Sequence, residues 1–185
     1  MHEASLSLTA NQQIPFESLI ADYGGMIARI AETYEAVPAR REELVQEISL
    51  NLWRALPGFR GDAALKTFIA RVAHNCSISH VAKETRNPRG DSMPELHIEE
   101  QSTPEMQTSL ADRRSKLMQA IRQLPLHQRQ LLSLMLEDLS HAEIADIMGL
   151  NTNTVAIRLS RARSRLKETM LKMETDSGQV SGGQL

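Results

Sequence analysis

Aromatic residues, cysteines and long apolar runs are all scarce in this chain. Phe, Trp and Tyr make up 3% of the 185 residues while Leu, Ile, Ala and Met are plentiful, which favours helices packed through aliphatic side chains over a β-sandwich or barrel. A single cysteine cannot form an internal disulfide, as is typical of a reducing compartment. No apolar run reaches the length of a membrane span, and residues 1–6 lack the basic and apolar regions of a secretion signal. We therefore expect a cytoplasmic, all-α protein.

Positive charge is scarce in the first part of the chain and concentrated near its end. Residues 1–110 contain 10 Lys and Arg against 15 Asp and Glu, a balance of −5, whereas residues 111–185 contain 11 against 8, a balance of +3. Within residues 151–172, six basic residues accompany a single acid, Glu168. Because an acidic N-terminal half opposes tight binding to phosphate-rich DNA, this distribution predicts a protein that reaches DNA with the help of a partner.

The apolar pattern divides the chain into two small helical domains. A helical period predicts three helices in the first of them, the last capped by Asp62, over residues 16–37, 40–56 and 62–85. Residues 88–110 hold three prolines and five acids against one arginine, which is typical of a flexible linker. The predicted fold is therefore all-α, with two helical domains joined by a flexible acidic linker. The assigned parts are an N-terminal tail 1–14, a first domain 15–87, the linker 88–110, a second domain 111–174 and a disordered tail 175–185.

The segment that starts at Ser140 has the pattern of a helix-turn-helix. Ser140 followed three residues later by Glu143 is a capping box, which predicts the start of a short helix. Gly149 predicts its end, and Asn151 or Thr152 can cap a second helix. That second helix carries basic residues on several faces: Arg158, Arg161, Arg163, Arg165 and Lys167. Such an arrangement predicts that the second helix enters the major groove of DNA.

A further group of polar and aromatic residues lies between residues 42 and 75. Four side chains share the exposed side of the predicted helix there: Glu42, Glu43, Gln46 and Glu47. Such a cluster is either a solvated face or a docking surface for a basic partner helix. Phe59, Arg60, Lys66 and Phe68 together are typical of a site for a splayed single-stranded base, with an aromatic wall for the base and cations for its phosphates. Phe68 fits a place in the core equally well.

His74, Cys76 and His80 raise the question of a metal site. Only Cys76 and His80 share a helical face, and zinc needs three or four protein ligands. We therefore expect no metal and no cofactor, with Cys76 as a small buried apolar residue. The sequence contains no pattern for nucleophilic or acid–base catalysis and no phosphate-binding glycine loop. We expect neither enzymatic activity nor a small-molecule substrate.

These motifs resemble those of the extracytoplasmic-function (ECF, group IV) sigma factors of the sigma-70 family. The features that resemble sigma region 2 are the run 43–47, Leu52-Trp53-Arg54, the loop 59–62 and the segment 66–75. The features that resemble sigma region 4 are Leu124-Pro125, Arg129 and the helix-turn-helix. The resemblance covers about residues 16–86 and 113–170, and the acidic linker lies where the family also has one.

The resemblance implies a promoter-specificity subunit that binds core RNA polymerase and promoter DNA and catalyses nothing itself. Region 2 would dock on the coiled coil of the polymerase β′ subunit through Glu43, Gln46, Glu47 and Trp53. It would melt and read the −10 element through Phe59, Arg60, Lys66, Thr67, Phe68, Arg71 and Asn75. Region 4 would contact the β flap and read the −35 element through Asn153, Thr154, Arg158, Ser160, Arg161 and Arg165.

The resemblance also implies a protein partner that controls activity. An anti-sigma factor would hold the protein inactive by clamping regions 2 and 4, and can hold it at the membrane. The active protein would work in the cytoplasm, associated with the nucleoid.

One part of the recognition helix departs from the family pattern, which usually has Gly-Thr-Val followed by a basic residue and Ser. Here the run is Asn153-Thr-Val-Ala-Ile157, so two positions that commonly touch DNA are apolar. Either Ile157 or Ala156 meets a thymine methyl group, or one of them faces the preceding helix. Two other functions stay open: a dimeric helix-turn-helix regulator that acts without polymerase docking, and an interaction protein with a vestigial DNA helix. The acidic helix and the linker argue against the regulator, since neither serves a dimeric repressor.

Overall fold

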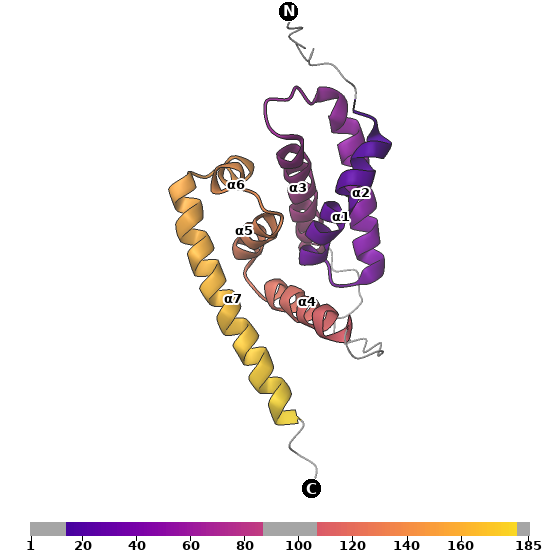
Figure 1. Ribbon diagram of the computed structural model, residues 1–185. Coiled ribbons are helices and arrows are strands. Elements are labelled where there is room, and N and C mark those ends of the chain that lie inside the picture. Colours follow the sequence, from indigo (N-terminus) through magenta and orange to yellow (C-terminus); the bar gives the residue numbers. More distant parts are fainter. Residues whose placement is uncertain (1–13, 87–106, 181–185) are drawn as a thin grey trace, which may run out of the picture.

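The computed structural model describes residues 14–86 and 107–180, and every regular element in these two stretches is a helix (Figure 1). The first stretch contains α1 (Phe16–Tyr34), α2 (Pro38–Ala55), the short 3-10 helix η1 (Leu56–Gly58) and α3 (Leu65–Arg86). The second contains α4 (Gln107–Arg122), α5 (Leu126–Leu136), α6 (His141–Met148) and α7 (Thr152–Val180). The prediction of an all-α fold with two helical parts is confirmed. We call α1–α3 the first unit and α4–α7 the second unit.

The first unit is a three-helix bundle in which α1, α2 and α3 each contact the other two. Leu19, Met26, Ile27 and Ile30 recur at helical spacing on α1 and are all buried, as the sequence pattern predicts. Pro38 does not end this helix, which stops at Tyr34. Pro38 instead occupies the first turn of α2, because its fixed φ suits a position whose N–H needs no helical partner.

Helix α3 differs from its prediction at its start and on its buried face. The amide of Phe68 donates to the carbonyl of Ala64 over 3.0 Å, so Ala64 rather than Asp62 stands at the N-cap position. Cys76 is only half-buried. The buried face of α3 combines small or apolar residues with polar ones, the latter being Thr67, His74, Ser77 and His80. Thr67, His74 and His80 find hydrogen-bond partners outside α3 that periodicity alone does not show, and Ser77 donates to the carbonyl of Ala73 one turn earlier in the same helix.

The second unit is built around α5, whose residues Leu131, Leu132 and Leu134 are fully buried. Helix α7 packs on α4, α5 and α6, and runs along one side of the molecule (Figure 1). The turn between α4 and α5 is held by Arg129, whose guanidinium donates to the carbonyls of Arg122 and Leu124 over 2.5 and 3.4 Å. These bonds satisfy carbonyl groups left open at the end of α4.

Three predicted boundaries are wrong by a few residues. Ile14, assigned to the tail, packs against the core, and residues 107–110, assigned to the linker, form the first turn of α4. Residues 175–180, assigned to a disordered tail, continue α7. The hydroxyl of Thr175 donates to the carbonyls of Leu171 and Lys172, which lets a threonine fit inside a helix. Once a helix has begun, the addition of further residues is favourable, so the helix continues past Thr175. Residues 1–13, 87–106 and 181–185 of the predicted tails and linker lie outside the described part of the chain.

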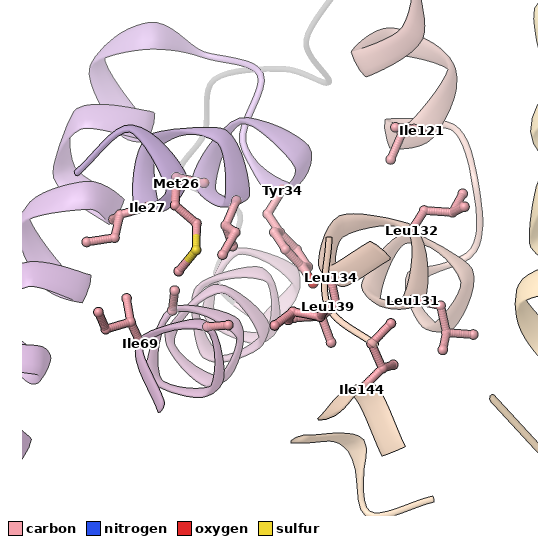
Figure 2. Packing of buried hydrophobic residues seen from close by; sticks show 14 of the residues in the cluster. Met26, Ile27, Tyr34, Ile69, Ile121, Leu131, Leu132, Leu134, Leu139 and Ile144 are labelled. Atoms are coloured by element: carbon pink, nitrogen blue, oxygen red, sulfur yellow. The ribbon is translucent and has the colours of Figure 1, made fainter. Parts of the chain in front are cut away.

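The two units share one hydrophobic core (Figure 2). Tyr34 at the end of α1 lies between the apolar residues of the first unit and the second-unit side chains Leu134 and Leu139 (Figure 2). Helices α1 and α3 of the first unit contact α5, while α1 also contacts α4 and α3 also contacts α6. None of the described helices is both long and apolar enough to cross a lipid bilayer.

Candidate nucleic-acid interface

The helix-turn-helix has the local geometry that its sequence predicts. The amide of Glu143 donates to Ser140 Oγ over 3.3 Å while the Ser140 amide donates to Glu143 Oε2 over 2.8 Å, which completes the capping box of α6. Gly149 ends α6 with a φ of 64°, in the left-handed region that glycine adopts without strain. Asn151 Oδ1 accepts from the Thr154 amide over 2.7 Å, so Asn151 rather than Thr152 caps α7.

Helix α7 buries one narrow face and presents the predicted −35 residues to solvent. Val155, Leu159 and Ala162 are fully buried against the rest of the second unit. The predicted contacts that lie exposed are Asn153, Arg158, Ser160, Arg161 and Arg165, whereas Thr154 is half-buried. Because Arg158, Arg161 and Arg165 lie on the solvent side over about two helical turns, this surface can hold a phosphate backbone while side chains reach base edges.

One further cation of α7 is tied to the protein itself. The guanidinium of Arg163 donates to the sulfur of Met135 on α5, at 3.2 Å from Nε and 3.0 Å from Nη2. This contact fixes α7 against α5. It leaves Arg163 less available to DNA than its sequence neighbours.

The predicted −10 residues divide into a group that forms no hydrogen bond or ion pair with α6 of the second unit and a group that is bonded to it. Phe59 and Phe68 stack with ring centroids 4.9 Å apart and planes tilted by 43°, so the loop and α3 bring the two aromatic side chains together. Arg60 and Asn75 are exposed, and Lys66 is half-buried. Phe68 also packs against the core, which is the second of the two places that the sequence leaves open for it.

The second group consists of Thr67 and Arg71, which bond to side chains of α6 in the second unit. Thr67 is 2% exposed, and its hydroxyl donates to Glu143 Oε1 over 2.5 Å. Arg71 forms an ion pair with Asp146. The hydrogen bonds from Thr67 and Ser140, with Lys66 nearby, lower the pKa of the Glu143 carboxyl to about 2, so it stays ionised at neutral pH. In this arrangement Thr67 and Arg71 are engaged by the second unit.

The predicted polymerase-binding residues lie on α2, on the side opposite its buried Leu44, Ile48 and Leu52. Trp53 is 59% exposed, an unusual position for the largest apolar side chain of the molecule. Glu43 and Gln46 are also exposed, and Glu47 accepts a hydrogen bond from Lys83 Nζ over 2.8 Å. A large exposed aromatic residue among acidic groups is typical of a protein-docking surface.

Several polar contacts between the units carry no signal in the sequence. Arg29 of α1 donates from Nε and Nη2 to the two carboxylate oxygens of Glu137 at the end of α5, over 2.9 and 2.7 Å. Thr33 donates to Ser133 over 3.0 Å, and Glu32 accepts from Arg114 over 2.5 Å. Together with the contacts of α6 they define what we call the closed arrangement, the packing of α1 and α3 against α4, α5 and α6.

Two buried histidines belong to hydrogen-bonded pairs inside the first unit. His74 Nδ1 lies 3.2 Å from the hydroxyl of Tyr34, and burial lowers the pKa of His74 to about 4. His80 Nε2 donates to the carboxylate of Glu35 over 3.0 Å. Burial raises the pKa of Glu35, but the hydrogen bonds from His80 and the Val37 amide outweigh it, so the pKa of Glu35 lies below its ordinary value. Across residues 14–86 and 107–180, no group of three or more His, Cys, Asp or Glu side chains is placed to hold a metal ion.

Comparison with known proteins supports both units. The profile of sigma-70 region 2 matches residues 19–87, and the profile of sigma-70 region 4 matches residues 114–166. The ECF RNA polymerase sigma-E factor of Escherichia coli K12 is 30% identical over 165 residues, which cover 83% of this chain and 85% of that protein. The RNA polymerase sigma-H factor of Pseudomonas aeruginosa is 28% identical over 165 residues, covering 84% and 86% of the two chains.

Solved structures share the fold. The sigma factor RpoE of Bartonella quintana, solved in complex with the anti-sigma factor NepR, superposes with a TM-score of 0.64 at 22% identity, covering 85% of this chain and 96% of that one. CnrH, solved in complex with the cytosolic domain of CnrY, superposes with a TM-score of 0.58 at 21% identity, covering 83% and 85%. At these identities the likeness describes the arrangement of the helices.

Proposed function

Because this chain belongs to the ECF sigma factors of the sigma-70 family, we propose that it binds core RNA polymerase and directs transcription from promoters with its own −35 and −10 elements. The observation that carries the proposal is the order of the two matched regions, each on a helical unit with a suitable surface. The protein would supply specificity and no chemistry of its own. Its place of work would be the cytoplasm, at the nucleoid.

The proposed roles follow the two units, residues 14–86 and 107–180, which residues 87–106 connect. The acidic face of α2 with Trp53 would dock on the β′ coiled coil, and the second unit would contact the β flap. The stacked Phe59 and Phe68, flanked by Arg60, Lys66 and Asn75, would hold a base flipped from the −10 element. Unstacking a base costs a few kcal/mol, which aromatic and cationic contacts to the strand would offset.

The −35 element would be read by α7. Arg158, Arg161 and Arg165 would contact phosphates or base edges, with Ser160 beside them. Asn153 and Thr154 lie at the helix N-terminus, where backbone N–H groups and the helix dipole favour a phosphate.

The closed arrangement would be the inactive form. Thr67 and Arg71, both proposed to touch the −10 strand, are bonded to α6, so reading that element requires the two units to separate. Residues 87–106 connect the units, and twenty residues can span at most about 70 Å, so covalent connection permits a wide separation. An anti-sigma factor, such as the NepR that binds RpoE, would act by stabilising a form in which the units stay inactive.

The test is transcription in vitro with bacterial core polymerase, with and without this protein, on a genomic fragment library read by 5′-end sequencing. We expect new start sites that share a −35 and −10 pair. The same preparation should co-elute with core polymerase in gel filtration. If no new starts appear and the protein does not bind core polymerase, the proposal is wrong and a polymerase-independent helix-turn-helix regulator becomes the better explanation.

A further inference from the structure

Ile157 is an exposed apolar residue in the second turn of α7. The residue is 47% exposed, while Val155, two residues earlier, is fully buried. Two residues correspond to a rotation of about 200° around a helix, so Ile157 points almost directly away from the core. Ala156, the other apolar residue of this run, is half-buried. The structure therefore distinguishes the two residues that the sequence leaves equivalent.

The neighbours of Ile157 on the helix surface are polar or cationic and also exposed. Asn153 lies one turn before it, and Ser160 and Arg161 lie one turn after it. In a helix-turn-helix the N-terminal part of the second helix contacts base edges in the major groove. Ile157 therefore stands among the side chains placed to meet bases. Other large exposed apolar residues of the described chain lie elsewhere: Leu50 and Trp53 on α2, Leu136 on α5, and Leu171 in the later part of α7.

The chemistry of the major groove selects one partner for such a side chain. Isoleucine can neither donate nor accept a hydrogen bond, and the C5-methyl group of thymine is the apolar group that base pairs present there. Against guanine, adenine or cytosine edges, Ile157 would remove water from polar atoms without replacing their hydrogen bonds, which is unfavourable. The nearby cations Arg158 and Arg161 draw the helix to DNA rather than to an apolar protein surface.

We propose that Ile157 is a specificity-determining residue, which selects thymine at one position of the −35 element by contact with the thymine methyl group. The inference rests on the proposed function and adds a base preference to it. It predicts that the promoters of this protein share a T·A pair at the position facing the second turn of α7. Replacing this residue should relax the preference at that position alone.

The experiment removes the methyl group from DNA and the side chain from the protein separately. A promoter found by in-vitro transcription is synthesised with each thymine of its −35 element replaced in turn by deoxyuridine, and binding of the holoenzyme is measured. For the unaltered protein we expect about fourfold weaker binding at one position, the effect of losing one buried methyl contact. Ile157→Ala should bind more weakly overall but should give equal affinities for thymine and deoxyuridine there.

Two control variants keep the result interpretable. Leu171→Ala removes a similarly exposed apolar side chain from the same helix, outside its first turns, and should keep the fourfold effect. Ile157→Val keeps a branched apolar side chain and should retain part of it. Equal deoxyuridine profiles for the unaltered protein and Ile157→Ala would overturn the inference. If the affinity of Ile157→Ala for core polymerase falls at the same time, the contact of Ile157 is with protein. A failure of the proposed function is distinguishable, because no promoter-directed start sites would appear at the first step, and this inference would fall with it.

Discussion

The ion pair between Arg29 and Glu137 offers a direct way to open the closed arrangement. Arg29 is 48% exposed on its side chain, but Glu137 is only 5% exposed, and both of its oxygens accept from the guanidinium. In Arg29→Met the carboxylate of Glu137 loses these two donors while the two units are packed. Leaving a buried acceptor without its partner costs about 1–3 kcal/mol, and we take about 2 because water reaches the arginine side of the pair.

This cost applies only to the closed arrangement. When the units separate, water solvates Glu137 and the penalty disappears. The equilibrium constant for opening should therefore rise about 30-fold in Arg29→Met, since each 1.4 kcal/mol is a factor of ten. The double variant Arg29→Met with Glu137→Met should return toward the original equilibrium, because removing both charges of a buried pair leaves no unpaired group.

Fluorescence energy transfer between the units measures this equilibrium. Dyes at exposed Ala39 on α2 and Lys172 on α7, introduced as cysteines in a Cys76→Ser background, report the distance between the units. Arg40→Met is the matched control, because it removes the same charge from an ion pair with Glu84 inside the first unit. If Arg29→Met gives the transfer efficiency of the unaltered protein while its helicity is intact, this pair does not hold the units together and the reasoning is wrong.

Three further predictions concern separate parts of the molecule. Burial holds the pKa of His74 near 4 against an ordinary value of 6.5, so the folded state loses stability as pH falls below 6.5. The free energy of unfolding from urea titrations should be about 2 kcal/mol lower at pH 5 than at pH 7, and His74→Gln should reduce that difference. Gly149→Ala should destabilise the second unit by about 1–2 kcal/mol, because φ is 64° at this position although the added methyl group meets no other atom. Gly24→Ala inside α1 should stabilise the protein by about 0.5–1 kcal/mol, and thermal melts of both variants separate backbone strain from crowding. Trp53→Ala should weaken binding to core polymerase at least tenfold with no loss of stability, since the side chain is exposed, and equal affinities by fluorescence anisotropy would count against docking through α2.

Local interactions explain why the helix-turn-helix was predictable. Its capping box joins residues three apart, and its turn depends on one glycine and one asparagine cap, so each signal lies within a few residues of the element it defines. The apolar faces of α1 and α7 follow helical periodicity for the same reason. Such features depend on backbone geometry that a short stretch of sequence sets by itself.

The contacts between the units depend on pairs that lie far apart in the chain. Thr67 and Glu143 are 76 residues apart, and Arg29 and Glu137 are 108 apart, and each of the four is by its type an ordinary surface residue. The buried polar face of α3 has the same origin, because Tyr34 at the end of α1 and Glu35 just after it supply the hydrogen-bond partners of His74 and His80. Periodicity reports where apolar residues recur, and it carries no information on which polar group meets which.

The two carboxylate oxygens of Glu143 accept hydrogen bonds from different parts of the molecule. Oε1 accepts from Thr67 across the boundary between the units, while Oε2 accepts from the amide and hydroxyl of Ser140 at the start of α6. Separation of the units would release only the first oxygen, so α6 and the turn into α7 would leave the boundary with their cap intact. The helix-turn-helix would therefore keep its structure when the two units separate. Activation would then be a rigid-body movement with no refolding step, and its rate would be set by the breaking of contacts between preformed parts.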